Sequence, residues 1–257
     1  MNRNRAKRQG ASVTVTVLGS GDAFASFGRG YSGYLIDAPG VRAVLEAGPT
    51  LVYALKNNRI VTNSIDVIII SHLHGDHFAG LPFLILEYMW ENPLKKPLTM
   101  IGPPKLAERT WRLMQTMYPR FELAKIQHQL KFVVLEPGAS RQLSGIEVSA
   151  IRSPHTKPDV SLSVGIEAAG KKIVFTGDSG WNDDLLKFSA GADLFLCECT
   201  YFKSRHRDFH LDYPLIAANR DKFDVRRMVL THLGSEVLSR KEKIGIALAF
   251  DGMKIKL

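Results

Sequence analysis

The sequence predicts a single α/β domain, and three observations support that fold class. Short segments rich in β-branched and apolar residues alternate with segments whose apolar side chains recur at helical spacing. The 257 residues have an ordinary globular composition, with 45% hydrophobic and 23% charged residues. No repeat, low-complexity linker or shift in composition divides the chain. One domain with two strand-rich halves is therefore the simplest expectation.

In the first half, strands and helices alternate. Residues 12–18 alternate β-branched side chains and end at glycine, which is typical of a strand. Proline near the start favours helices at 49–57 and 104–118. Apolar side chains at helical spacing favour a helix at 80–90. Further strands are expected at 34–36, 41–45, 65–70 and 98–101.

The second half is expected to contain more strand than helix. Strands are predicted at 131–135, 146–151, 161–167, 171–175, 193–197 and 228–230, and helices at 183–189, 213–222 and 236–243. The two cysteines, Cys197 and Cys199, alternate at the end of a predicted buried strand. Two cysteines are too few for a disulfide scaffold, so packing is the simplest role for them.

Charge and hydropathy limit the compartment and the partners. Residues 1–10 are basic and predict a flexible tail ahead of a domain at 11–257. No apolar segment follows that tail and none has the roughly 20 residues of a membrane helix, so we expect a cytoplasmic protein with no membrane contact. The net charge of +9 favours anionic ligands and permits non-specific contact with nucleic acid such as RNA.

A histidine-rich loop follows the expected strand at 65–70. His72, His74, Asp76 and His77 place four potential metal ligands within six residues. Unliganded imidazoles gathered in a desolvated loop would be costly. Imidazole and carboxylate donors suit Zn²⁺, Mn²⁺ or Fe²⁺, and Gly75 lets the backbone approach an ion closely. The loop therefore predicts a metal site.

Three further donors stand where strands are expected to end. His155 follows the strand at 146–151, Asp178 follows that at 171–175, and His232 follows that at 228–230. Loops at strand ends are where metal-binding and catalytic residues gather on sheet scaffolds. Together with the histidine loop, these residues complete a set for two divalent ions, with one carboxylate available to bridge them.

These residues, in this order, resemble the metallo-β-lactamase superfamily. The resemblance rests on the segment His72-Leu73-His74-Gly75-Asp76-His77 and on the three later donors, and it spans most of the chain. It implies a four-layer αββα sandwich in a single domain with the metals at one sheet edge. It assigns His72, His74 and His155 to one metal, and Asp76, His77 and His232 to the other, with Asp178 bridging.

Within the superfamily, the sequence is most similar to the ribonuclease Z and small phosphodiesterase branch. Authentic β-lactamases commonly carry cysteine at the place of Asp178, and flavodiiron oxygen reductases carry glutamate at that of His74. Segments 18–22, 74–82, 191–202 and 251–253 resemble the ribonuclease Z branch. The resemblance also implies that His210 is the proton donor, although Leu211-Asp212 follows it where ribonuclease Z has Ser-Thr.

The expected function is a phosphodiesterase acting on a small or cyclic phosphate ester. Ribonuclease Z commonly carries a long basic arm between the counterparts of His155 and Asp178. The 22 residues between these positions read as strand, turn and strand, without room for an arm. Three alternatives stay open: a ribonuclease Z-like endonuclease acting at tRNA 3′ ends, a carboxylic ester or lactone hydrolase, and a non-catalytic binding protein.

The expected mechanism uses a water shared by two ions, whose pKa falls toward neutrality so that hydroxide attacks phosphorus. His210 would protonate the leaving oxygen. Asp76 is a second catalytic candidate, because it could assist deprotonation of the water, although ligation reduces its basicity. Glu198 is expected to orient a histidine. Zn²⁺ is the expected metal, Mn²⁺ suits the same donors, and a homodimer is one expectation for the assembly.

Overall fold

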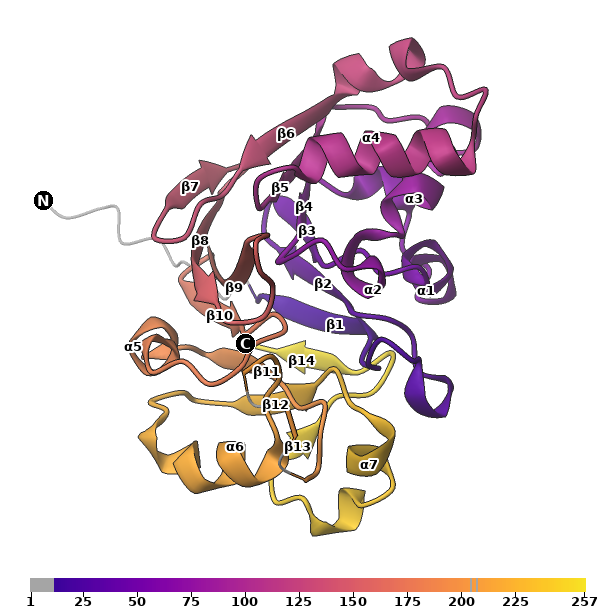
Figure 1. Ribbon diagram of the computed structural model, residues 1–257. Coiled ribbons are helices and arrows are strands. Elements are labelled where there is room, and N and C mark those ends of the chain that lie inside the picture. Colours follow the sequence, from indigo (N-terminus) through magenta and orange to yellow (C-terminus); the bar gives the residue numbers. More distant parts are fainter. Residues whose placement is uncertain (1–11, 204, 207) are drawn as a thin grey trace, which may run out of the picture.

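Two β-sheets packed face to face, with helices on both outer faces, form the domain (Figure 1). The computed structural model describes residues 12–203, 205–206 and 208–257, and the basic tail expected at 1–10 lies outside the described residues. An apolar core fills the space between the sheets, and two further apolar clusters join each sheet to its helices. The expected α/β fold with αββα layers is confirmed.

The first sheet has seven strands in the order β14-β1-β2-β3-β4-β5-β6. Strands β3 to β6 run parallel to one another, and β14, β1 and β2 complete the sheet with antiparallel pairings. The carboxyl ends of β3 and β4 therefore lie side by side at one edge. The bounds are β1 Thr14–Gly19, β2 Gly33–Ala38, β3 Val41–Leu45, β4 Val67–Ile69, β5 Leu98–Gly102, β6 Leu130–Val134 and β14 Lys254–Lys256.

The second sheet also has seven strands, in the order β13-β12-β11-β10-β9-β8-β7. Strands β10 to β13 are parallel, whereas β7, β8, β9 and β10 pair antiparallel. The carboxyl ends of β10, β11 and β12 consequently share one edge. The bounds are β7 Ser140–Leu143, β8 Ile146–Ser153, β9 Ser161–Ala168, β10 Lys171–Phe175, β11 Leu194–Glu198, β12 Met228–Thr231 and β13 Ala247–Leu248.

Helices α1 to α4 belong to the first sheet and α5 to α7 to the second (Figure 1). Their bounds are α1 Leu51–Asn57, α2 Gly75–Phe78, α3 Leu81–Trp90, α4 Leu106–Met117, α5 Asp184–Ser189, α6 Tyr213–Asn219 and α7 Ser235–Leu238. Short 3₁₀ turns are η1 Ser26–Gly28, η2 Thr62–Ser64, η3 Leu123–Lys125, η4 Gln127–Gln129, η5 Arg220–Lys222 and η6 Lys241–Lys243. Within the described ranges, every helix is too short or too polar to cross a bilayer.

The two sheets are joined by large side chains as well as by small apolar ones. The rings of Tyr34 on β2 and Phe175 on β10 lie 5.3 Å apart between centroids. The Tyr34 hydroxyl shares a 2.6 Å hydrogen bond with the Thr231 hydroxyl on β12. Burial raises the pKa of Tyr34 above its ordinary value, so the hydroxyl stays protonated. This contact fixes the two sheet edges that carry the site relative to each other.

Strands β7, β13 and β14 were not predicted from the sequence. Each lies at the edge of a sheet, is short, and carries few buried side chains. In β14 only Ile255 is buried, so hydrophobicity gives a weak signal there. The helices expected at 213–222 and 236–243 are shorter than predicted: α6 gives way directly to a 3₁₀ turn, and α7 ends two residues before one.

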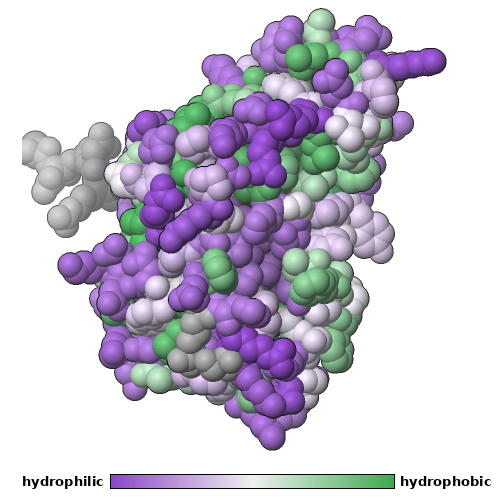
Figure 2. All heavy atoms as spheres, viewed as in Figure 1, coloured by the Kyte–Doolittle hydropathy of each residue, from purple (hydrophilic) through white to green (hydrophobic). Residues whose placement is uncertain are grey.

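The face seen in Figure 1 is mostly hydrophilic. In the space-filling view, its hydrophobic residues form separate areas among hydrophilic ones (Figure 2). The exposed aromatic residues of the chain include Phe24, Phe27, Trp90, Phe209 and Phe250. Single exposed apolar residues are normal, so position relative to the site decides which of them are functional candidates.

Candidate metal centre

The histidine loop lies at the edge where the parallel strands of the first sheet end. Strand β4 is followed by His72, which is fully buried, and by the exposed His74. The first turn of α2 then presents Asp76 and His77. These four side chains lie close together because the extended segment that carries His72 and His74 runs directly into the helix that carries Asp76 and His77.

The second sheet supplies the other donors at its facing edge. His155 lies in the loop between β8 and β9, Asp178 follows β10, and His232 follows β12. His232 has a φ of 52°, in the left-handed region, where a residue other than glycine costs on the order of 1–3 kcal/mol. The Thr200 hydroxyl, 2.9 Å from His232 Nδ1, supports this conformation.

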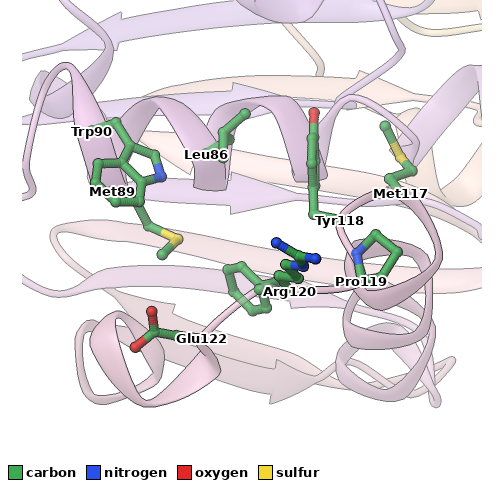
Figure 3. A pocket seen from close by; sticks show the side chains of 9 residues that line it. Leu86, Met89, Trp90, Met117, Tyr118, Pro119, Arg120 and Glu122 are labelled. Atoms are coloured by element: carbon green, nitrogen blue, oxygen red, sulfur yellow. The ribbon is translucent and has the colours of Figure 1, made fainter.

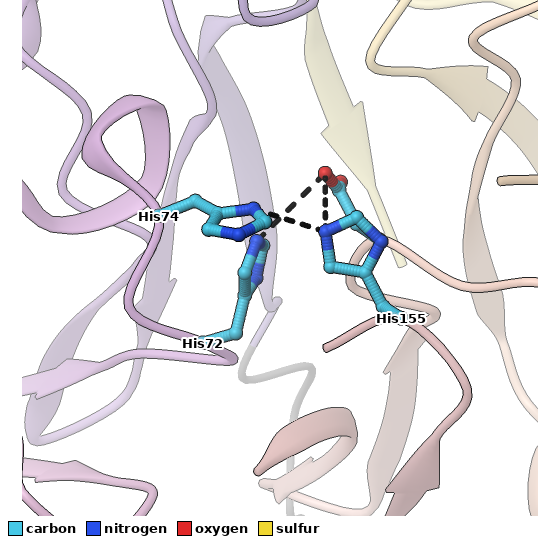
Figure 4. Close-up of side chains that lie close together, drawn as sticks. His72, His74 and His155 are labelled. Carbon is cyan, nitrogen blue, oxygen red and sulfur yellow. Dashed lines mark hydrogen bonds and ion pairs between the residues drawn. The ribbon is translucent and has the colours of Figure 1, made fainter. Parts of the chain in front are cut away.

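Two groups of four potential ligands form at this junction. In each group the ligand atoms lie within 4.8 Å of one another. Figure 4 shows the imidazoles of the first group pointing toward one another around a carboxylate. The first group is His72, His74, His155 and Asp178, and the second is Asp76, His77, Asp178 and His232.

Asp178 belongs to both groups, and its two oxygens face different groups. Oδ2 lies 3.8 Å from His72 Nε2 and 3.6 Å from His155 Nε2. Oδ1 lies 3.3 Å from His77 Nε2 and 3.5 Å from His232 Nε2. A carboxylate in this position can ligate two ions at once, one through each oxygen.

Unsatisfied buried atoms show that the residues fit a metal. Among the described residues, the buried side-chain atoms without a hydrogen-bond partner include His72 Nε2, His77 Nε2 and Asp178 Oδ1. Buried polar atoms are normally paired, because leaving one unpaired costs about 1–3 kcal/mol. All three atoms face the junction of the two ligand groups. A divalent cation there would satisfy them together.

The protonation states of most donors also fit. Burial lowers the pKa of His72 well below its ordinary value, and burial likewise lowers those of His74 and His155, so these imidazoles are neutral at neutral pH. Burial opposes ionisation of Asp178, but the neighbouring His232 and His77 hold its pKa well below the usual range. Neutral imidazole and ionised carboxylate are the forms that bind metals.

His77 differs, because carboxylates surround it. Burial acts to lower its pKa, but Asp178, Asp76 and Glu46 together raise it well above the ordinary value. Several negative charges around one buried imidazole are costly unless a positive charge compensates them. A divalent cation bound by His77 would supply it.

Glu46 is a part of the centre that the sequence analysis missed. It directly follows β3, is fully buried and has a φ of 64°. Its carboxylate accepts hydrogen bonds from the Ser71 backbone N–H at 2.7 Å, the Ser71 hydroxyl at 3.0 Å and His77 Nδ1 at 2.5 Å. The available signal was a carboxylate directly after a predicted apolar strand.

Changing Glu46 to glutamine is expected to weaken metal binding by about 10–100-fold, the usual effect of losing a partner behind a metal-binding histidine. The carboxylate accepts a hydrogen bond from Nδ1–H of His77, which favours the tautomer whose Nε2 lone pair can bind an ion. A glutamine amide that turns its NH₂ toward His77 favours the other tautomer. Titration against a competing chelator measures the loss.

Glu87→Gln is the matched control for this change. Glu87 is also buried, but it lies on α3 and forms an ion pair with Lys56 at 2.8 Å. Metal affinity should be unchanged in that variant. An unchanged affinity in Glu46→Gln as well would contradict the role given to Glu46.

His210 lies beside the two ligand groups, between β11 and α6. Its ring centroid is 4.8 Å from that of His155 and 5.8 Å from that of His232. Nδ1 donates to Glu198 Oε1 at 2.9 Å, and Glu198 is itself fixed by the Ser179 backbone N–H at 2.8 Å. Burial acts to lower the pKa of His210, but Glu198 raises it to about 9.

His210 is therefore protonated at neutral pH. Among the described residues, none forms a hydrogen bond with its Nε2, so that N–H is free to donate at the edge of the centre. The expectation that Glu198 orients a histidine agrees with this contact. Both cysteines are buried behind this segment, in agreement with a packing role.

A separate cavity of about 440 Å³ lies between the ends of α3 and α4 (Figure 3). Its lining is mainly apolar, with Leu86, Met89, Trp90 and Tyr118 among the residues that face it. None of its lining residues is a candidate metal ligand. The candidate ligands therefore lie at the sheet edges and not in this cavity.

Comparison with known proteins agrees with this geometry. Ribonuclease Z of Clostridium novyi is 23% identical over 91% of this chain and 93% of its own length. The structure of human tRNase Z, short form, covers 94% of this chain and 98% of its own, with a TM-score of 0.74 and 25% identity. The metallo-β-lactamase fold protein YhfI from Bacillus subtilis has a TM-score of 0.77 and 20% identity, over 96% of this chain and 100% of its own.

The fold, the ligand groups and these relatives together describe a metal-dependent hydrolase of the ribonuclease Z and phosphodiesterase type. A family model described as anti-Pycsar protein Apyc1 matches residues 13–250, nearly the whole chain. The chain therefore belongs to the anti-Pycsar protein Apyc1 family, within the ribonuclease Z-like branch of the metallo-β-lactamase superfamily.

Proposed function

We propose that this protein is a phosphodiesterase that uses two divalent ions, Zn²⁺ or Mn²⁺, to hydrolyse a small or cyclic phosphate ester. The observation that carries the proposal is the placement of Asp178 between two complete ligand groups, with the protonated His210 at their rim. Two ions sharing a carboxylate suit in-line displacement at phosphorus.

Each residue has a definite part in this proposal. His72, His74 and His155 would hold one ion, Asp76, His77 and His232 the other, and Asp178 both. Bound there, the ions would act as Lewis acids and lower the pKa of a water molecule toward neutrality. His210 would donate the proton that the leaving oxygen needs. Glu198 would keep His210 charged, and Asp76 would act through ligation, since two histidines already contact its carboxylate.

The segment between His155 and Asp178 supports a small substrate. It forms the hairpin β9–β10, whose turn consists of Ala169 and Gly170. Long basic arms that hold tRNA have no counterpart in that hairpin. A small ester fits this arrangement better than a folded RNA. The family's description names an anti-Pycsar protein, and we extend that role to this chain as the cellular function of the hydrolase.

A ribonuclease is the second candidate, because ribonuclease Z of Clostridium novyi matches nine-tenths of the chain and the net charge is +9. A hydrolase of carboxylic esters or lactones is the third. The metal-loaded protein should be assayed in parallel on bis(p-nitrophenyl) phosphate, a panel of cyclic nucleotides, a lactone and a precursor tRNA.

The phosphodiesters are expected to be hydrolysed with the highest kcat/KM, and His210→Ala should lose activity on the cyclic nucleotides. Preferential cleavage of the precursor tRNA would replace the proposal with the ribonuclease reading. Preferential cleavage of the lactone would support the third reading, and inertness of a fully loaded sample toward all substrates would support a binding protein.

A further inference from the structure

The loop after β1 lies at the edge of the first sheet that carries the candidate metal centre. Strands β1 and β3 each pair antiparallel with β2, so they run in the same direction. Their carboxyl ends therefore share one edge of the sheet. Ser20 is the first residue after β1 and is fully buried. Its contacts therefore lie close to the metal ligands.

His232 is a candidate ligand whose backbone needs support from its surroundings. Its φ of 52° is a strained value, which persists only where neighbouring contacts fix it. Before it in the chain, the Thr231 carbonyl accepts a hydrogen bond from the Cys199 N–H at 2.8 Å. After it, the Leu233 N–H donates to the Ser20 carbonyl at 2.9 Å. This second contact joins the two sheets directly beside the ligand.

Ser20 is itself held by the carboxylate of Asp251. Oδ1 accepts hydrogen bonds from the Ser20 backbone N–H at 2.9 Å and from the Ser20 hydroxyl at 2.7 Å. Oδ2 accepts a third hydrogen bond, from the Gly30 N–H at 2.6 Å. Hydrogen bonds to an ionised carboxylate are roughly twice as strong as those between neutral groups. The N–H, hydroxyl and carbonyl of Ser20 are thus all engaged, which fixes the carbonyl that holds Leu233.

Asp251 lies in the turn between β13 and β14, and this turn is anchored to both sheets. The Gly252 N–H donates to the Val17 carbonyl on β1 at 2.8 Å. The Ala249 N–H donates to the Leu230 carbonyl on β12 at 2.8 Å. The carboxylate is therefore fixed relative to the two strands whose ends its contacts connect.

We propose that Asp251 is a positioning residue for His232 and acts through the backbone of Ser20. This inference rests on the proposed function and extends the metal centre to a residue outside both ligand groups. Nε2 of His232 lies 3.2 Å from Asp76 Oδ2 and 3.5 Å from Asp178 Oδ1. Functional side chains must be held within about 0.5 Å of their working geometry, so relaxation of the strained backbone would move this nitrogen out of its group.

The effect of losing Asp251 is expected to be selective for one ion. His232 belongs to the second ligand group and not to the first. Asp251→Ala should lower the affinity for one ion per chain by about 10–100-fold, the usual effect of losing a residue that orients a ligand. The other ion should bind as in the wild-type protein. A merely structural role would instead weaken both ions together.

Dialysis of the Zn²⁺-loaded proteins against a series of chelator concentrations, followed by elemental analysis, measures this selectivity. In one range of concentrations the wild-type protein should keep two ions per chain and Asp251→Ala one. Asp251→Asn should recover most of the lost affinity, because its amide oxygen accepts both hydrogen bonds from Ser20. An asparagine variant as weak as the alanine variant would point to charge and not to the contact with Ser20, and would overturn the inference.

Asp66→Ala is the matched control. Asp66 directly precedes β4, accepts a hydrogen bond from the Arg42 backbone N–H at 2.8 Å and pairs with Lys96. It lies at the end of the first sheet remote from the centre, so this variant should keep both ions. Release of both ions together by Asp251→Ala, or retention of both, would contradict the positioning role. A wild-type protein that binds fewer than two ions would overturn the proposed function instead.

Discussion

Asp178→Asn is expected to reduce phosphodiesterase activity by more than 100-fold and to lower the metal content of the purified protein. Loss of a partner that merely supports a ligand costs about 10–100-fold, and Asp178 directly faces both ligand groups with one oxygen each. The amide removes the negative charge and presents NH₂ to one of the groups. Elemental analysis and steady-state kinetics measure the two effects.

Asp193→Asn is the control for this substitution. Asp193 precedes β11, at the end of that strand remote from the centre, and pairs with Lys171 at 3.0 Å. Activity and metal content should stay at the wild-type level there. If Asp178→Asn kept two ions per chain and full activity, the bridging role would be wrong, and with it the dinuclear mechanism.

His210→Ala is expected to lower kcat by about 10²–10⁴-fold, the range for losing a general acid, and to retain the metal. The loss should depend on the leaving group. An ester whose leaving group is an alcohol needs a proton at the departing oxygen, whereas p-nitrophenolate leaves readily without one. Cyclic nucleotides should therefore be affected far more than bis(p-nitrophenyl) phosphate.

His206→Ala serves as the comparison for His210→Ala. His206 is an exposed histidine of the same segment and belongs to neither ligand group. The His206→Ala variant should hydrolyse both substrates at the wild-type rate. A loss in His210→Ala that is equal for both leaving groups would indicate that His210 positions the substrate and does not protonate it.

The candidate ligands could be predicted because their signal is local. His72, His74, Asp76 and His77 are close in sequence, and Asp178 and His232 lie within three residues of the ends of apolar strands. Parallel strands place their carboxyl ends at one edge, which brings such residues together. The histidine motif and the donors at strand ends therefore predicted the cluster, and the resemblance to the metallo-β-lactamase superfamily divided it between two ions.

The partners of those residues could not be predicted in the same way. Glu46 reaches His77 because β3 and β4 are neighbours in the sheet, and strand order does not follow from apolar pattern. A cavity next to His155 is lined by Trp181 and Phe209, which come from loops separated by β11. Loop conformation is set by tertiary contacts, so only the structure brings the two rings to one cavity.

The ligand groups draw on both sheets, since His72 and His77 belong to the first and His155, Asp178 and His232 to the second. Bound ions would thus clamp the two halves of the sandwich together. Ligands that bind only the folded state stabilise it by mass action, by about 4.1 kcal/mol at a thousandfold excess over Kd. The lifetime of this protein in a cell would then follow the supply of its metal, because starvation for the ion would open the sandwich to proteases.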